Sequence, residues 1–343
     1  VFCKQSIAGA GFKDLLNRRP ILISFATASV VFSCFTSKPM AKKICFLNIK
    51  GGVGKTSLIV NIGACLAYMG RRTLIVDFDA QSNASIWLMR LDRWNTLNRE
   101  PEKFLLHLFR DEKMKLADCI QKSPIRDTDG EEMLPRLDLV PASFTLMDLE
   151  HEVPKVADRP FYTRFYEALA SVEAEYDFIL YDCPPNFFYT TQCALFSSDH
   201  VIVPSNPDAL SIIGFHLLVD KLTRFRSDSA PHRERLGAPN PEIIGIALNA
   251  VKPGTKIHVP LERFNAQIDR FKKQDKVSAK THIYPDLVRH SVTVGRAVMM
   301  GIPTVLMSKQ DASINLAEDY IKLTKHLLDQ LGDPEPDDPD DEE

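Results

Sequence analysis

The sequence predicts a doubly wound α/β fold, in which helices cover both faces of a mostly parallel sheet. Short, continuous apolar runs recur along the chain, and stretches of helical character separate them. Strands that are buried on both faces have this pattern, and right-handed crossovers put helices on both sides of the sheet. A glycine-rich loop lies between the first such run and the first helix, which is where open α/β sheets bind ligands.

Six apolar runs are the predicted strands: residues 44–48, 73–76, 137–140, 178–181, 200–204 and 243–248. Residues 58–69 have apolar side chains at helical spacing and end at Gly70, a common helix stop. The longer, more polar stretch 85–136 predicts helices and loops within the same domain. A last helix is expected over residues 313–331.

Composition narrows the class of protein. Apolar residues make up 45% and charged residues 25% of the 343, as in soluble globular chains. The net charge of -3 means that any nucleic-acid site must be a local patch. Seven scattered cysteines without a C-x-x-C pair argue against a disulfide framework and favour a reducing cytosol.

The glycine-rich loop reads Lys50-Gly-Gly-Val-Gly-Lys-Thr-Ser57 and has the context of a P-loop. Glycines let backbone N–H groups turn toward phosphate oxygens, and the next helix presents its positive end to the same anion. Lys55 is predicted to reach the β- and γ-phosphates, and the Thr56 hydroxyl to coordinate Mg²⁺. The predicted ligands are therefore ATP and Mg²⁺, bound by Gly51, Gly52, Val53, Gly54, Lys55, Thr56 and Ser57.

Carboxylates follow two of the predicted strands. Asp77 and Asp79 come after the second strand, and Asp182 comes after the fourth. The carboxyl ends of parallel strands face the ligand crevice, where carboxylates can hold Mg²⁺ through water or orient an attacking water. Together with the loop, these side chains predict a phosphoryl-transfer site.

These motifs resemble the ParA/MinD group of deviant-Walker ATPases, and ParA-type partition ATPases most closely. Residues 50–57 resemble the group's deviant Walker A, residues 77–81 the motif after the second strand, and residues 178–185 the Walker B stretch. Supporting segments follow in the expected order at 139–143, 204–210, 245–249 and 296–303. The resemblance covers residues 41–331. Ala80 replaces a usual proline and Ser57 a usual threonine.

The resemblance implies roles for individual residues. ATP would lie between the subunits of a homodimer, with Lys50 reaching the partner's nucleotide. Lys50, Lys55 and Asp79 would be catalytic, Asp79 by positioning the water. Asp182 would act on Mg²⁺ through water, and Asn249 would hydrogen-bond adenine. A partner of ParB type would stimulate a slow basal hydrolysis.

A basic segment provides candidate DNA contacts. Residues 252–280 hold eight Lys or Arg against three acidic residues. Such a patch gives salt-sensitive, sequence-independent affinity for DNA. The expected function is therefore chromosome or plasmid partitioning by a cytoplasmic, nucleoid-associated ATPase without stable membrane association. The candidate DNA-binding residues are Lys252, Lys256, Arg270, Lys272, Lys273, Lys276 and Lys280.

Three alternatives remain at this point. A MinD-like ATPase that cycles on a membrane needs a basic amphipathic C-terminal helix, but here an acidic tail follows the last helix. An iron-protein-like electron donor needs paired cysteines, and only Cys183 and Cys193 lie near the Walker B run. A ParA relative that positions another cargo is not separated from DNA segregation by any motif.

Three segments are expected. Residues 1–39 carry Arg18-Arg19 and an apolar stretch at 21–35, yet Met40-Ala-Lys-Lys reads as a natural beginning. We interpret 1–39 as a leader or upstream segment, residues 40–331 as the ATPase domain, and residues 332–343 as an acidic disordered tail.

Overall fold

A computed structural model describes residues 40–127, 129–152, 160–307 and 314–333. The predictions for residues 1–39 and for most of the acidic tail lie outside the described residues. Asp333, near the start of that tail, is described. Its carboxylate pairs with Arg71 at 2.9 Å and with Lys42 at 3.4 Å.

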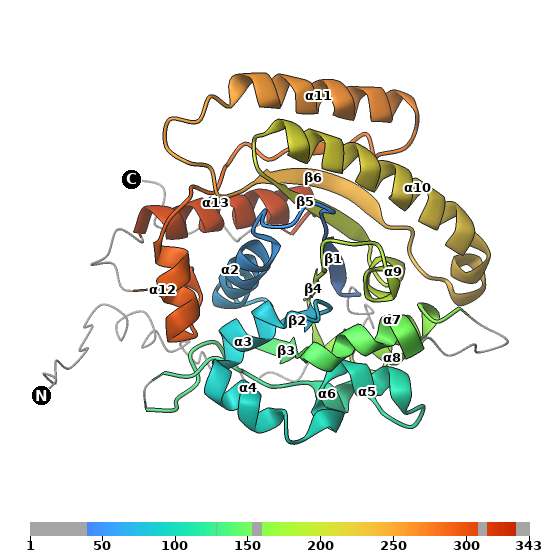
Figure 1. The fold of residues 1–343 in the computed structure, drawn as a ribbon, viewed down its shortest axis with the longest axis vertical. Coiled ribbons are helices and arrows are strands. Elements are labelled where there is room, and N and C mark those ends of the chain that lie inside the picture. Colours follow the sequence, from blue (N-terminus) through green and yellow to red (C-terminus); the bar gives the residue numbers. More distant parts are fainter. Residues whose placement is uncertain (1–39, 128, 153–159, 308–313, 334–343) are drawn as a thin grey trace, which may run out of the picture. The chain divides into compact units, whose positions relative to one another are not determined.

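Within the described residues, seven parallel strands form one sheet in the order β3-β2-β4-β1-β5-β6-β7 (Figure 1). The predicted doubly wound fold is confirmed. A two-residue strand, His282–Ile283, was not predicted because no apolar run marks it. The strands are β1 (Lys42–Phe46), β2 (Thr73–Asp77), β3 (Leu137–Val140), β4 (Phe178–Asp182), β5 (His200–Ser205), β6 (Glu242–Leu248) and β7 (His282–Ile283).

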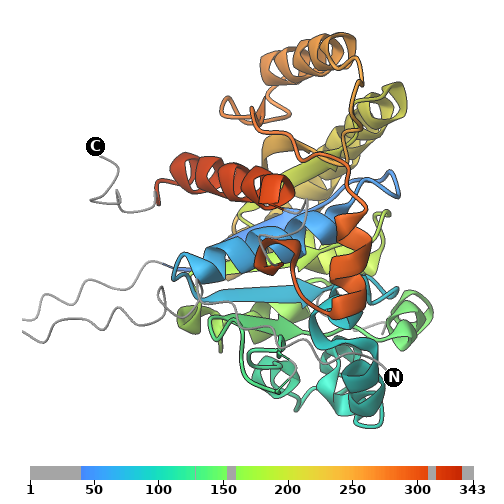
Figure 2. The ribbon, with the colours of Figure 1, turned by 90° about the vertical axis from the view of Figure 1, so that its left-hand side faces the viewer.

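Helices cover both faces of this sheet (Figure 1). In Figure 2, which looks onto one face, α2 and α13 lie next to each other across the strands. Short 3-10 turns lie at Pro101–Lys103, Phe144–Asp148, Glu173–Glu175 and Thr304–Leu306. The helices are α2 (Lys55–Tyr68), α3 (Asn83–Met89), α4 (Leu91–Leu97), α5 (Leu105–Arg110), α6 (Leu116–Cys119), α7 (Leu149–Glu152), α8 (Thr163–Leu169), α9 (Tyr189–Phe196), α10 (Ala209–Leu236), α11 (His258–Lys273), α12 (Thr293–Met300) and α13 (Ile314–Gln330).

The hydrophobic core has two layers, one on each face of the sheet. Successive side chains of a strand point to opposite faces. In β1, Ile44 and Phe46 therefore pack into the layer under α2 and α13, whereas Cys45 packs into the layer under α9 and α10. Because both faces are covered, β1 is apolar at consecutive positions, which is the pattern that predicted it.

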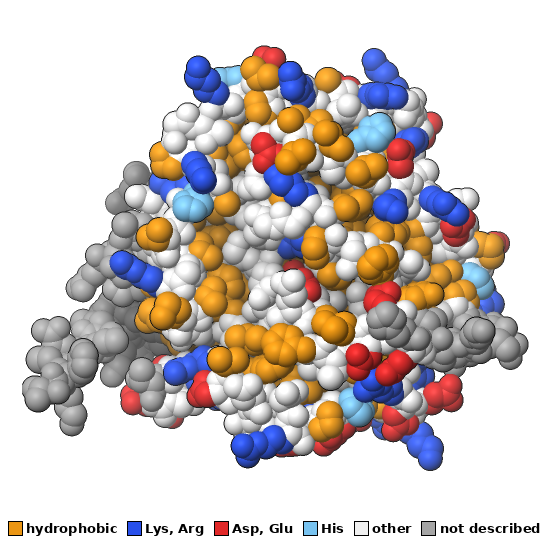
Figure 3. All heavy atoms as spheres, viewed as in Figure 1, with side chains coloured by type: hydrophobic (Ala, Val, Ile, Leu, Met, Phe, Trp, Pro, Cys, Tyr) orange, Lys and Arg blue, Asp and Glu red, His pale blue; other side chains and the backbone are white. Residues whose placement is uncertain are grey.

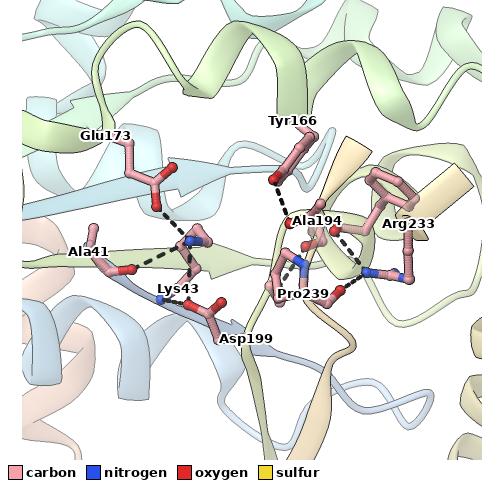
Figure 4. A network of polar contacts seen from close by, with 11 residues as sticks. Ala41, Lys43, Tyr166, Glu173, Ala194, Asp199, Arg233 and Pro239 are labelled. Carbon is pink, nitrogen blue, oxygen red and sulfur yellow. Dashed lines mark hydrogen bonds and ion pairs between the residues drawn. The ribbon is translucent and has the colours of Figure 1, made fainter. Parts of the chain in front are cut away.

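Charged side chains tie the strands together at the amino edge of the sheet (Figure 4). The buried Lys43 ammonium lies 2.5 Å from a Glu173 carboxylate oxygen and 3.5 Å from an Asp199 oxygen. The Lys43 backbone N–H also donates to Asp199 at 2.8 Å. This pairing lets β1 begin at Lys42, two residues before the apolar run that the sequence shows.

Arg233, near the end of α10, fastens this helix to α9 (Figure 4). Its buried guanidinium donates to the Phe196 carbonyl at 3.0 Å, the Leu195 carbonyl at 3.3 Å and the Pro239 carbonyl. Carbonyls at the end of a helix lack partners within the helix, so the guanidinium acts as a cap for α9. These buried contacts lie away from the carboxyl edge, where the candidate site lies.

Candidate active site

The loop after β1 has a backbone shape that depends on glycine. Gly52 and Gly54 have φ angles of 73° and 76°, in the left-handed region. A Cβ on Gly54 would also lie 2.1 Å from Asn249 Nδ2, so any other residue there would displace Asn249 as well as strain the backbone. A Cβ on Gly51 or Gly52 would meet nothing within 4 Å. The loop is therefore closely packed at Gly54 and open at Gly51 and Gly52, where an anion can approach the backbone.

Lys55 begins α2, and its side chain is buried among groups of the site. It is 8% exposed, and its Nζ lies 3.4 Å from the Asn48 carbonyl. Burial lowers the pKa of Lys55, while the Asp182 and Asp79 carboxylates act in the opposite direction. A lysine placed here, at the positive end of α2, provides a desolvated positive charge for an anion held by the loop.

Asp182 ends β4, directly beside the loop strand β1 and in register with Asp77 of β2. It is 1% exposed, and neither carboxylate oxygen has a hydrogen-bond donor in bonding geometry within the described chain. Burial and the neighbouring Asp79 raise the pKa of Asp182 to about 7, although Thr56 and Lys55 oppose this. The Asp182 carboxylate is buried without a hydrogen-bond donor and lies next to the Thr56 hydroxyl. Oxygen atoms of these two kinds are the ligands that Mg²⁺ prefers, directly or through water.

Asp77 and Asp79 shape the turn after β2. Asp77 accepts hydrogen bonds from the Ser85 backbone N–H at 2.9 Å, the Ser85 hydroxyl at 2.6 Å and the Asp79 N–H at 3.1 Å. Burial and Asp182 raise the pKa of Asp77 well above its usual range. Asp79 accepts from the Gln81 N–H at 2.9 Å through Oδ1. Asp77 therefore holds the turn, and the turn presents Asp79 to the site.

Lys50, the first lysine of the loop, pairs with a carboxylate at the start of α10. Its Nζ lies 2.5 Å from Asp208 Oδ2 and 3.2 Å from Ser211 Oγ. Asp208 also caps α10, because its Oδ1 accepts from the Ser211 N–H at 2.8 Å. Burial would raise the pKa of Asp208, but hydrogen bonds from Lys50 and Ser211 outweigh it and lower this pKa. Lys50 is thus held at the outer rim of the site by the start of α10.

A cavity of about 390 Å³ lies beside the loop. Its walls include Trp87 of α3, Arg289 to Ser291, and Tyr320 of α13. Asn249 is buried at its inner end and donates through Nδ2 to the Val53 and Gly54 carbonyls, both at 3.0 Å. The Asn249 amide nitrogen therefore fixes the loop, and its Oδ1 has no donor from the described residues. Whether Asn249 contacts adenine stays a prediction.

Comparison with known proteins places this site in a family. A family model described as an AAA domain matches residues 41–234. A ParA family protein of Chlamydia pneumoniae is 30% identical over 298 residues, which cover 85% of this chain and 99% of that protein. The chain belongs to the ParA family of P-loop ATPases. The resemblance inferred from the sequence motifs is confirmed.

Other similarities agree with membership of the ParA family. The sporulation initiation inhibitor protein Soj of Bacillus subtilis is 28% identical over 297 residues, covering 84% of this chain and 98% of Soj. Cobyrinic acid a,c-diamide synthase of Mycobacterium smegmatis, solved with an ATP analogue and magnesium, superposes with a TM-score of 0.59. That comparison covers 85% of this chain and 95% of the synthase at 19% identity, and it shows a shared fold. The bound ATP analogue and magnesium are properties of that synthase, whose fold this chain shares.

The ParA-family fold brings most of the predicted site residues together. Lys55, Thr56, Asp79, Asp182 and Asn249 converge on one edge of the sheet, as their strand-end positions predicted. The candidate DNA-binding residues lie elsewhere, on and around α11, which packs outside α10 (Figure 1).

Sequence reasoning missed three groups at the site. Asp208 lies within a motif segment that pointed to the family, but its pairing with Lys50 depends on the placement of α10. Arg289 and Tyr320 follow no motif, because α13 and the segment before α12 reach the loop only through the tertiary fold.

Proposed function

We propose that this chain is an ATPase of the ParA type that dimerises on ATP, binds DNA without sequence preference and releases it after hydrolysis. A partner protein of ParB type would stimulate that hydrolysis. One observation carries the proposal: a single loop holds two lysines in different settings. Lys55 is buried among the carboxylates, whereas Lys50 lies at the rim, with its side chain 23% exposed.

Each residue of the site has a role in ATP hydrolysis. The loop amides and Lys55 bind the phosphates of the protein's own nucleotide. Thr56 and Asp182 would hold Mg²⁺, which, when bound, neutralises charge on the phosphate oxygens. Asp79 orients the attacking water and accepts its proton. Lys50, once it leaves Asp208, provides a second positive charge for the nucleotide of the facing subunit. Slow basal turnover is expected while Lys50 remains on Asp208.

An apolar stripe on α10 supports the dimer. Leu210, Ile213 and Leu217 are 66%, 58% and 48% exposed, and their spacing puts them on one face of the helix. The stripe begins two residues after Asp208, the partner of Lys50. Apolar side chains also surround the central hollow in Figure 3, which views the carboxyl edge of the sheet. A second copy that covers this face would bury the stripe and bring its nucleotide to Lys50.

Replacing Ile213 with aspartate should prevent the ATP-dependent dimer. A carboxylate buried in an apolar interface without a partner costs several kcal/mol. Light scattering after size exclusion, with a non-hydrolysable ATP analogue, should show monomer for Ile213→Asp and dimer for the unmodified chain. Nucleotide affinity of the monomer should be unchanged. Tyr68→Asp is the matched control. Tyr68 is as exposed as Ile213, at 58%, and it is the last residue of α2, at the end of that helix away from the loop. A dimer in Ile213→Asp would place the interface elsewhere.

The candidate DNA surface follows α11. The inner side of this helix, with Phe264, Ile268 and Phe271, is buried against the rest of the domain. Most of the predicted basic residues are exposed, although Lys276 pairs with Asp220 of α10 at 2.7 Å. Because α11 has 16 residues and is about 24 Å long, Lys252 and Lys256 lie at one end and the other candidates at the other.

Charge reversal of Lys272 and Lys273 to glutamate should weaken DNA binding at least about tenfold at moderate salt and leave ATP affinity unchanged. Removing phosphate contacts should also reduce the salt dependence of binding. The measurement is a titration of double-stranded DNA with ATP, ADP or no nucleotide, at two salt concentrations. Arg99→Glu with Lys113→Glu makes the same charge change near α4 and α5 and serves as the control. Equal DNA affinity in both double variants would remove α11 from the interface.

Other ParA-like functions remain distinguishable in the same assay. In the described part of the chain, no helix is long and apolar enough to span a bilayer. The apolar side of α13, including Leu316, Leu323 and Leu327, is buried in the core and does not face a lipid surface. A protein that binds ATP and dimerises without ATP-dependent DNA binding would instead position another cargo.

A further inference from the structure

A buried asparagine joins the start of the loop to the neighbouring strand. Asn48 lies two residues after the end of β1 and is fully buried. Its Nδ2 donates to the Pro204 carbonyl at 2.7 Å and lies 3.3 Å from Ser205 Oγ, both at the end of β5. Its Oδ1 accepts from the Lys50 backbone N–H at 2.9 Å. One carboxamide therefore connects the loop with β5, and both its nitrogen and its oxygen have partners.

The first turns of α10 pack against this carboxamide. A Cβ on Gly214 of α10 would lie 3.3 Å from Asn48 Oδ1 and 3.8 Å from Lys50 Cβ, so the helix approaches both residues through a glycine. Reversing the amide would turn Oδ1 toward the Pro204 carbonyl and Nδ2 toward the Lys50 N–H, which would lose both hydrogen bonds. The Asn48 side chain is therefore held in one orientation between β5 and α10.

Asn48 contacts both ends of the loop. The bond from the Lys50 N–H to Oδ1 spans two residues and forms an Asx turn, in which a side-chain oxygen takes the place of a backbone carbonyl. This turn sets the direction in which the chain enters Gly51 and Gly52, where the backbone is open to an anion. The backbone carbonyl of Asn48 also accepts from Lys55 Nζ at 3.4 Å. One buried residue thus contacts both lysines of the loop.

The Asn48 carboxamide is not needed to hold β1 in the sheet. β1 pairs with β4 and β5 through its own backbone, and the Leu47 N–H after it still donates to the Ile202 carbonyl at 3.1 Å. An apolar side chain could fill the space of the amide, and a buried amide costs free energy unless it is hydrogen-bonded. The contacts with the loop and with β5 therefore explain why a polar residue lies here.

We propose that Asn48 is a positioning residue for nucleotide binding. Its Asx turn holds the loop backbone in the conformation that presents N–H groups to phosphates, and its bonds to β5 keep that turn in place. The proposal rests on the proposed ATPase function, because the ligand of the loop is ATP. It also means that the loop is anchored to β5 and α10, the two elements that place Asp208 beside Lys50.

Asn48→Ala and Asn48→Ser test this proposal as a pair. Both remove the bonds to β5 and a similar volume, but a serine hydroxyl can still accept from the N–H two residues later. Titration of the full chain with a fluorescent ATP analogue should show about tenfold weaker binding for Asn48→Ala and at most about threefold for Asn48→Ser, since the alanine variant loses one more hydrogen bond. Both should lower the unfolding temperature by a similar amount, so the difference in affinity reports the turn.

Asn61→Ala is the matched control. Asn61 is another fully buried asparagine, which donates to the Ser57 carbonyl within α2 at 2.8 Å and accepts from the Val305 N–H at 3.2 Å. Its bonds fasten α2 to the turn at Thr304–Leu306 and do not reach the start of the loop. Asn61→Ala should therefore destabilise the fold and leave nucleotide affinity unchanged.

Hydrogen exchange without nucleotide separates positioning from general stability. The Lys50 amide should exchange faster in Asn48→Ala than in Asn48→Ser or Asn61→Ala. In every folded variant of Asn48, ATP affinity and Lys50 protection should change together, and a change in one without the other would overturn the proposal. Equal losses of affinity in Asn48→Ala, Asn48→Ser and Asn61→Ala would also overturn it. Failure of the unmodified chain to bind ATP would instead refute the ATPase function, and Lys50 exchange would still test the turn.

Discussion

Lys55→Ala should reduce ATP affinity at least about 100-fold. Hydrogen bonds to charged groups contribute about 1.5–3 kcal/mol each, and a lysine that reaches two phosphates makes more than one. Lys55 is the lysine that the structure buries beside Asp182, on the first turn of α2. Without it, the phosphates would face the Asp79 and Asp182 carboxylates with no positive side chain between them. Titration with a fluorescent ATP analogue measures the loss.

The matched control lies in the same loop. Lys50→Ala removes an equal charge five residues away, but Lys50 is held by Asp208 at the rim and not by the phosphate site. It should bind ATP with nearly unchanged affinity as a monomer and fail in the steps that need a second subunit. If Lys55→Ala binds ATP normally, or if both variants lose affinity equally, the two lysines do not have the separate roles that their settings indicate.

Much of the fold could be predicted because the strands are buried on both faces. Six apolar runs matched six strands, with small shifts at the ends. The predicted first strand ran to residue 48, but β1 ends at Phe46, since Asn48 turns its side chain to the Lys50 N–H and to the Pro204 carbonyl. The predicted first helix began at residue 58, whereas α2 begins at Lys55, because the end of the phosphate loop forms its first turn.

The site could be predicted only where local sequence determines it. The glycines, Lys55 and the strand-end carboxylates lie in short motifs, and parallel strands bring their ends to one edge. The restraint of Lys50 by Asp208 joins residues 158 positions apart, and Tyr320 of α13 lines the same cavity as Ser57 although the two residues come from opposite ends of the domain. No periodicity or spacing encodes such contacts. They follow from how α10 and α13 pack on the sheet.

Asp79→Ala should bind ATP as tightly as the unmodified chain, or slightly more tightly, and hydrolyse it at least about 100-fold more slowly. Removing a carboxylate near the phosphates relieves repulsion in the bound state, and losing a positioned base costs 10²–10⁴ in rate. Phosphate release at saturating ATP and Mg²⁺ measures the rate, and the fluorescent titration measures affinity. Since bound ATP would persist, this variant should also accumulate as a dimer.

Asp79→Asn decides whether the carboxylate acts chemically or only shapes the turn. Asparagine keeps the Oδ1 that accepts from the Gln81 N–H, so the turn that follows β2 should retain its form. It cannot take a proton from water at neutral pH. Both variants should therefore be slow. A normal rate in Asp79→Asn together with a slow rate in Asp79→Ala would assign Asp79 to the geometry of the turn, and the base would then have to be sought elsewhere along the same edge of the sheet.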